Sequence, residues 1–200
     1  MTDAERRGTQ RVTISDPRVM RALAHPARLA IMEHLGSTGE SVTATSCAEV
    51  AGLSPSATSY HLRALAKAGL VEEAPSRGDG RERLWQPTVP AFAIDAGQDA
   101  TDDVRAAESA LVDAFLQRDF ERIRTWARSA HLAPPEWYNV GQLSSIVCTM
   151  TPDEALAVSQ AISDLVDPYR SRTRTAPPDN ARTVVIHYAA TPRDVLPPAD

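Results

Sequence analysis

The stretch "SPSATSYHLRALAK", residues 54–67, carries hydroxyl side chains at its start and the basic side chains of Arg63 and Lys67 further along. It contains no Asp or Glu, although the chain as a whole has more acidic than basic residues. Hydroxyl groups and cations without neighbouring carboxylates suit hydrogen bonds to phosphate oxygens and to the polar edges of nucleic-acid bases. The alternative interpretation is an ordinary helix face turned toward solvent.

A helix through these residues has two distinct faces. With 100° between successive residues, Thr58, Leu62 and Leu65 fall within an arc of about 60°, which we expect to pack inward. The opposite arc holds the polar side chains of Ser56, Ser59, Tyr60, Arg63 and Lys67. Ser54 is a favourable N-cap ahead of a proline, and Gly69 is a stop signal. The free amide groups at such a helix start attract phosphate.

The next stretch, "LVEEAPSRGDGRERLWQP" (residues 70–87), predicts two strands joined by a turn-rich tip that contains two glycines. Guanidinium groups gather at this tip, on Arg77, Arg81 and Arg83. Asp79 and Glu82 offset part of their charge. A tip of this kind suits contact with the sugar–phosphate backbone or entry into a minor groove, and a solvated turn is the alternative.

Three shorter helices are predicted upstream. Asp16 followed by Pro17 starts the first, and Pro26 ends it and opens the second, so that the two meet at an angle. We expect the second to end at about residue 35, ahead of a loop at residues 36–41. The third, "ATSCAEVAG", ends at Gly52.

A short helix, a turn, a second helix and a glycine-tipped hairpin follow one another in the order of a winged helix-turn-helix. The chain resembles the ArsR-type winged-helix transcriptional regulators in "ALAHPARLAIMEHL", "AEVAGLSPSATSYHLRALAKAGLV" and "GRERLWQP". The resemblance implies a homodimeric regulator of operator DNA, with a repressor favoured over an activator. Its recognition helix (residues 54–68) would enter the major groove, and its wing (residues 75–84) would lie on the flanking backbone or minor groove. With Lys67 added from the outward face, the expected DNA contacts are Ser54, Ser56, Ala57, Ser59, Tyr60, Arg63, Lys67, Arg77, Arg81 and Arg83.

The sequence departs from that family at its sensory sites. Many members carry Cys-x-Cys where this chain has only Cys47, and others use histidine on the helix that corresponds to residues 101–130, which here has none. A metal ion needs two to four converging ligands, and the His and Cys residues show no such spacing, so no metal or other cofactor is expected. We expect Cys47 to be a small buried residue. Thr58 stands where the family usually has an aliphatic residue, and we expect its hydroxyl to bond to the preceding turn.

The second half predicts a long amphipathic helix over residues 101–130, after a connector at 87–100. Its apolar side chains need a partner surface, and the family resemblance favours dimerisation through Leu111, Phe115, Ile123 and Trp126. Core packing within one subunit is the alternative. Residues 140–190 predict a strand, a helix with a capping box at Thr151 that runs to about residue 172, and a second strand, "TVVIHYA".

This strand–helix–strand region has three interpretations: it binds a small-molecule or protein effector, extends the dimer or contacts another protein. Aromatic side chains that would line a pocket, or form core, are Trp126, Trp137, Tyr138 and Tyr169.

The predicted fold is mainly α with α+β elements. It consists of a flexible arm (1–15), a winged helix-turn-helix domain (16–95) and a helical dimerisation and regulatory region (96–200). Residues 1–95 hold 11 acidic and 11 basic residues, and the remainder holds 15 and 10. The neutral first half leaves a second interpretation open, in which the winged helix docks a protein and binds no DNA.

The remaining features favour a cytoplasmic protein. No apolar run approaches the roughly 20 residues that span a membrane, the N-terminus lacks the apolar core of a signal peptide, and two distant cysteines fit a reducing compartment. We find no phosphate-binding glycine loop, metal dyad or nucleophile motif, so no enzymatic activity is expected.

Overall fold

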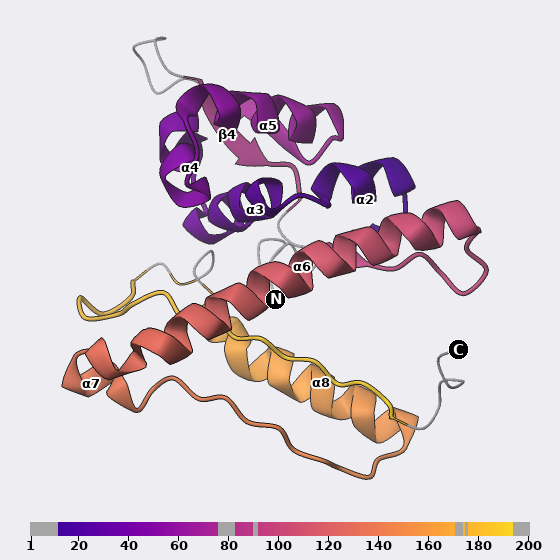
Figure 1. Cartoon of the computed structure of the whole chain (residues 1–200), viewed down its shortest axis with the longest axis vertical. Helices are drawn as coiled ribbons and strands as arrows, with labels where there is room; N and C mark the ends of the chain where they lie inside the picture. The colour runs from indigo at the N-terminus through magenta and orange to yellow at the C-terminus, as the bar shows by residue number, and fades with distance from the viewer. Residues whose placement is uncertain (1–11, 76–82, 90–91, 171–173, 175, 194–200) are drawn as a thin grey trace. The chain divides into compact units, whose positions relative to one another are not determined.

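The computed structural model describes residues 12–75, 83–89, 92–170, 174 and 176–193 (Figure 1). The chain forms two compact units, Met1–Arg124 and Thr125–Asp200. The elements of the first unit are β1 (Val12–Ile14), α2 (Pro17–Leu23), α3 (Pro26–Thr38), β2 (Val42–Thr43), α4 (Ala44–Ala51), α5 (Pro55–Lys67), β3 (Val71–Ala74), β4 (Leu84–Pro87), β5 (Phe92–Ile94) and most of α6 (Asp102–Ser129). The second unit holds the end of α6, η1 (Ala130–Leu132), α7 (Pro135–Tyr138), α8 (Pro152–Val166) and η2 (Asp167–Tyr169). None of the described helices combines the length and the apolar character needed to cross a bilayer.

The predicted start of α2 at Asp16 and the predicted break between α2 and α3 at Pro26 are both present, and each helix begins with a side-chain cap. The Asp16 carboxylate accepts a hydrogen bond from the backbone N–H of Arg18 at 2.8 Å, and His25 Nδ1 accepts one from the N–H of Ala27 at 3.1 Å. The predicted end of α3 at residue 35 is wrong, because the helix continues to Thr38. Gly39, at φ 65°, provides the left-handed C-cap, and Gly36 lies inside the helix rather than in the predicted loop.

The helices α4 and α5 have the predicted ends. The hydroxyl of Thr43 caps α4 by accepting from the Ser46 N–H at 3.1 Å, and that of Ser54 caps α5 by accepting from the Ala57 N–H at 3.3 Å. Gly52 ends α4 with φ 63°, a left-handed conformation that favours glycine. The chain then turns directly into α5, which gives a helix-turn-helix (Figure 1).

The predicted hairpin is confirmed as the antiparallel pair β3 and β4, with Val71 opposite Pro87 and Ala74 opposite Leu84. Its tip, residues 76–82, lies outside the described residues. The two-residue strand β2 adds a third strand beside β4. Two residues are too short to show an alternating pattern, so the sequence did not predict β2.

Two sequence predictions are corrected by a second, parallel pair of strands. β1 lies in the predicted flexible arm 1–15 and β5 in the predicted connector 87–100, and their residues pair from Val12 with Phe92 to Ile14 with Ile94. Ile14 is buried. A parallel pair between segments about 80 residues apart leaves no local signal, because neither short strand carries a turn that marks its partner.

The core of the first unit is made by buried side chains from α2 to α6, with Trp85 from β4. Thr58 is fully buried, and its hydroxyl donates to the Ser54 carbonyl at 3.0 Å, as predicted. Cys47 is also fully buried, as predicted, and burial raises the pKa of its thiol to about 11. Leu62 and Leu65 complete the inward face of α5.

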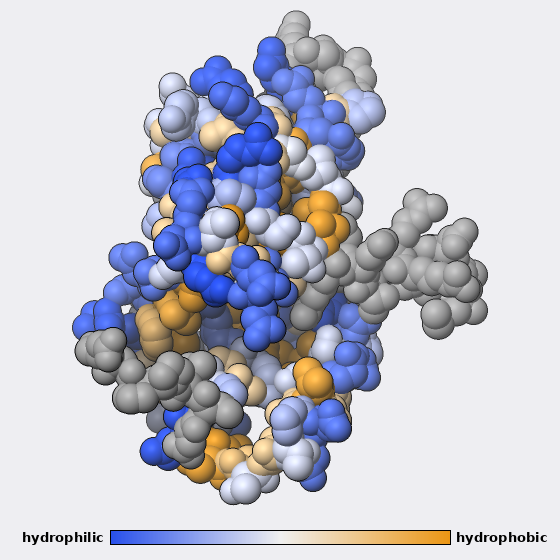
Figure 2. Space-filling view, turned by 90° about the vertical axis from the view of Figure 1, so that its right-hand side faces the viewer, coloured by the Kyte–Doolittle hydropathy of each residue, from blue (hydrophilic) through white to orange (hydrophobic). Residues whose placement is uncertain are grey.

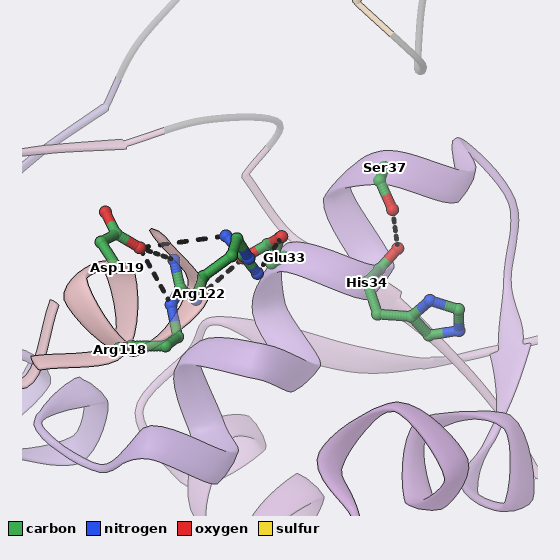
Figure 3. Close-up of polar contacts among 6 residues, drawn as sticks. All are labelled: Glu33, His34, Ser37, Arg118, Asp119 and Arg122. Atoms are coloured by element: carbon green, nitrogen blue, oxygen red, sulfur yellow. Dashed lines mark hydrogen bonds and ion pairs between the residues drawn. The ribbon is translucent and has the colours of Figure 1, made fainter. Parts of the chain in front are cut away.

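A group of ion pairs joins α3 to α6 within the first unit (Figure 3). The Glu33 carboxylate meets Arg118 Nη1 at 3.0 Å and Arg122 Nη2 at 2.9 Å. Arg118 also lies over the Phe115 ring, 5.2 Å from its centroid, and pairs with Asp119 at 3.3 Å. These contacts hold α6 against the helix that supports α4 and α5.

The second unit contains the predicted helix but not the predicted strands. In α8 the capping box is present, because Thr151 Oγ1 accepts from the Glu154 N–H at 3.3 Å and Glu154 accepts from the Thr151 N–H at 2.8 Å. The helix ends at Val166 rather than near residue 172, ahead of the turn that contains Pro168. Residues 143–150 and 183–189 form no strand in the described chain, because an alternating pattern becomes a strand only where another strand supplies the ladder.

Candidate nucleic-acid interface

The outward face of α5 is a row of exposed polar side chains on a buried support. Ser56, Arg63 and Lys67 are exposed, and no described residue bonds or pairs with their side chains. Because α5 carries no carboxylate and its opposite face is fully buried, the helix presents unneutralised cations from a fixed position. Such a surface can bond to phosphates and to the acceptor atoms of guanine.

The other predicted contacts on α5 have local roles as well. Ser54 uses its hydroxyl oxygen as the N-cap, and Ser59 donates its hydroxyl to the Pro55 carbonyl at 2.9 Å. Ala57 is half-buried. Each of these two serine hydroxyls retains lone pairs, and Ser54 also retains its O–H donor, so of the two only Ser54 can donate to a phosphate oxygen without losing a contact.

The exposed Tyr60 contacts one of two adjacent histidines. The rings of His25 and His61 are 4.7 Å apart, and the Tyr60 ring meets His61 edge-on at 5.5 Å. Burial lowers the pKa of both histidines; in His61 the neighbouring His25 and then Arg28 lower it further, and in His25 Arg28 does so. Sequence reasoning named Tyr60 but missed Arg28 and His25, which lie on α3 and at its N-cap.

Only the base of the wing lies within the described residues. Arg83 is exposed and pairs across the hairpin with Glu73 at 3.0 Å, whereas Arg77 and Arg81 lie outside the described residues. Next to it, Gln86 donates to Glu72 at 2.8 Å. Because Glu72 and Glu73 lie on the same hairpin, the described base of the wing is less positive than its arginines alone would suggest.

The long helix α6 has two apolar faces. Leu111 is fully buried in the core of its own unit, and Phe115 packs against that core. These two residues therefore follow the alternative interpretation, core packing within one subunit. A second face, about 120° around the helix, remains exposed. It consists of Val112, Leu116, Phe120 and Trp126, with Ile123 half-buried among them. The residues predicted for dimerisation include Ile123 and Trp126 of this face but not the other three.

A shallow hollow of about 550 Å³ lies in the second unit, and Trp126 and Tyr138 line it with the polar groups of His131, Asn139 and Gln142. Two of the four aromatic residues predicted for a pocket therefore meet there, and Trp137 and Tyr169 do not. A Cβ at Gly141 would overlap the Trp126 indole. Within the described ranges, no cluster of three His, Cys, Asp or Glu residues could hold a metal ion.

Comparisons with known proteins agree with the geometry of the first unit. Residues 23–74, from the end of α2 to the end of β3, match a family described as a helix-turn-helix domain. The chain therefore carries a helix-turn-helix domain, of the kind with which DNA-binding regulators contact the double helix. No curated protein matches the chain.

Among solved structures, the chain is similar to a mutant of Lactococcus lactis ZitR in its apo form, with 17% identity over 73% of this chain and 83% of that one. The TM-score is 0.32. Similarity at this level does not establish a common overall fold or function.

Proposed function

We propose that the chain is a homodimeric transcriptional regulator of the ArsR type, most simply a repressor, that binds operator DNA. The observation that carries the proposal is the outward face of α5, which has no carboxylate and on which Arg63 and Lys67 are exposed without a partner among the described residues. The helix-turn-helix match supports the same assignment. A pseudo-palindromic operator with half-sites about one helical turn apart would suit two copies.

In the proposed complex α5 lies in the major groove. Arg63 would read guanine, and Lys67, Ser54 and Ser56 would hold phosphates near the two ends of the helix. The amide groups in the first turn of α5 add to phosphate binding. Arg83, with Arg77 and Arg81 at the tip, is proposed to hold the flanking backbone or minor groove.

We propose that dimerisation uses the exposed apolar face of α6 around Phe120, Ile123 and Trp126. Leu111 and Phe115 would act indirectly, because they anchor α6 to the core from which α5 projects. The regulator is proposed to act in the cytoplasm without enzymatic activity, and the second unit is the proposed place for an effector.

The test starts from genomic footprinting of the tagged protein, which supplies a natural site for binding measurements. The double variant Arg63→Ala/Lys67→Ala should lose binding to that site by at least about 100-fold, given roughly 1 to 3 kcal/mol for a good base contact plus a phosphate contact. Arg124→Ala, which removes the same charge from an ion pair with Glu121 on α6, is the matched control and should bind normally. Equal binding by the double variant and the control would refute the proposed DNA face.

A second function is supported by the neutral charge of residues 1–95 and by the exposed Glu72 and Glu73 on β3. In that case the winged helix would dock another protein and never contact DNA. Footprinting that recovers no reproducible sites, together with a partner that remains bound at high salt, would favour this function over the first.

A further inference from the structure

In the described part of the second unit, no side chain is buried. Between Thr125 and Arg193, every described residue is exposed or half-exposed, whereas the first unit has a continuous buried core. Figure 2 shows hydrophobic side chains exposed in several separate patches on the face in view. A unit of this length cannot offset the conformational entropy of ordering its chain without burying apolar surface. Something must therefore cover it.

The uncovered surface is concentrated on two extended segments, residues 143–150 and 183–189, and on α8 between them. The most exposed large apolar side chains in these segments are Leu143, Ile146, Val147, Val184, Ile186 and Tyr188, at 47–80%. Leu156 and Leu165 of α8 are 69% and 72% exposed. Their combined exposed area is on the order of 1,000 Å², against roughly 800 Å² per partner in a standard protein interface.

Both segments have the composition of strands, but neither has a partner strand within the described ranges. Val184, Ile186 and Tyr188 alternate, β-branched and aromatic residues predominate, and the backbone is drawn as an extended trace in Figure 1. Neither segment pairs with any described strand. Strand-like segments whose backbone groups have no ladder partner are templates for pairing with another chain.

The charge of these segments indicates which partner covers them. Neither contains Asp, Glu, Lys or Arg, although exposed edge strands of monomers usually carry such residues to prevent association. A permanently covered, largely apolar surface is typical of interfaces between identical subunits, whereas transient partners meet more polar surfaces. A second copy also brings the same two segments, which is what a two-fold interface requires.

We propose that residues 143–150 and 183–189 are interface strands that pair with a second copy of this chain, so that the Thr125–Asp200 unit is complete only in the homodimer. The inference rests on the homodimer proposed above and assigns it a second contact surface, distinct from the exposed face of α6. Segments that lack a ladder in one chain become strands when the partner supplies it.

Hydrogen exchange of the intact protein tests the pairing directly. At concentrations where the protein is dimeric, the backbone amides of residues 143–150 and 183–189 should exchange on the order of 100-fold more slowly than unpaired amides. Dilution to the monomer should remove this protection. Fast exchange in the dimer, or protection that persists in the monomer, overturns the inference, because the segments would then be open or covered within one chain.

Substitutions separate side-chain packing from strand pairing. Val185→Pro keeps an apolar side chain but removes an amide donor, so it should weaken the dimer by at least about tenfold if residue 185 lies in a ladder. Ile186→Glu should weaken it further, and Thr191→Glu, beyond the apolar run, should leave it unchanged. A normal dimer with both Val185→Pro and Ile186→Glu overturns the inference.

Operator binding measured on the same samples distinguishes a failure of this inference from a failure of the proposed function. A protein that shows protected segments and a stable dimer but no operator binding contradicts only the proposed function. A protein that binds operator DNA while its 143–150 and 183–189 amides exchange rapidly contradicts only the interface strands.

Discussion

Arg63 and Lys67 lie one turn apart on the exposed face of α5, yet they would contribute differently to DNA binding. A planar guanidinium can bond to two acceptors of one guanine, whereas an ammonium group acts as a point charge on phosphate. Arg63→Ala should therefore weaken binding to the specific site by about 1 to 3 kcal/mol relative to binding of non-specific DNA. Lys67→Ala should weaken binding to all sequences and lower the salt slope by about one. Fluorescence anisotropy at several salt concentrations measures both, and identical profiles for the two variants would contradict the assignment.

The paired histidines should make the first unit sensitive to acid. Burial and Arg28 lower the pKa of His25 and His61 below the ordinary value of 6.5, so the folded state favours their neutral forms. The stability from this preference is complete above about pH 6.5 and is lost as the pH falls from there toward the lowered pKa values, because the unfolded chain binds protons first. Thermal unfolding between pH 7.5 and 5 should show this loss.

The double variant His25→Asn/His61→Gln is the matched control for that titration. Asparagine keeps an N-cap acceptor for α3, and neither replacement titrates in this range. Its stability should change less with pH than that of the unmodified protein. An unchanged pH dependence would assign the acid sensitivity to other groups.

Gly36 and Gly52 lie at different points of their helices, so replacing each with alanine should change the stability of the protein in opposite directions. A Cβ at Gly36 or Gly52 would meet nothing within 4 Å, so backbone conformation alone decides. Gly36 lies inside α3, where alanine should stabilise by about 0.5 to 1 kcal/mol. Gly52 has φ 63° at the end of α4, and alanine there should cost about 1 kcal/mol. Chemical denaturation measures both, and a shift of the same sign would contradict the helix ends described here.

The ion pairs between α3 and α6 should matter more than those within α6. Glu33→Gln leaves Arg118, whose side chain is 17% exposed, and Arg122 without their shared carboxylate, and should cost about 1 kcal/mol of stability after screening by solvent. Glu121→Gln breaks an exposed pair with Arg124 and should cost less than about 0.5 kcal/mol. Equal costs in denaturation experiments would mean that Glu33 does not join the two helices.

For the whole molecule, the exposed face of α6 gives the test of proposed dimerisation. Phe120 is 60% exposed in one chain, and Phe120→Glu would place a charge in the proposed interface, raising the dimer dissociation constant by at least about 100-fold. Gln117→Glu adds the same charge to the exposed polar side of the helix and should have little effect. Sedimentation velocity across a dilution series separates them. Normal dimer affinity in the Phe120→Glu variant would show that the dimer interface does not include this face of α6.

Much of the first unit follows from local chemistry. The caps at Asp16 and Ser54, the stop at Gly52 and the inward Thr58 depend on residues within a turn of one another, so the sequence alone predicted α2, α4, α5 and the hairpin. The polar face of α5 followed from helical periodicity in the same way. The sequence could therefore identify the candidate DNA-binding surface, although Arg77 and Arg81 are not described.

Only the tertiary structure decided the features that depend on distant partners. The pairing of β1 with β5, the burial of Leu111 inside its own unit and the grouping of His25, Arg28 and His61 join residues that are far apart in the chain and leave no local pattern. The segments 143–150 and 183–189, which form no strand in the described chain, illustrate the same limit. Alternation determines that a segment can form a strand, but hydrogen bonding to a second segment decides whether it does.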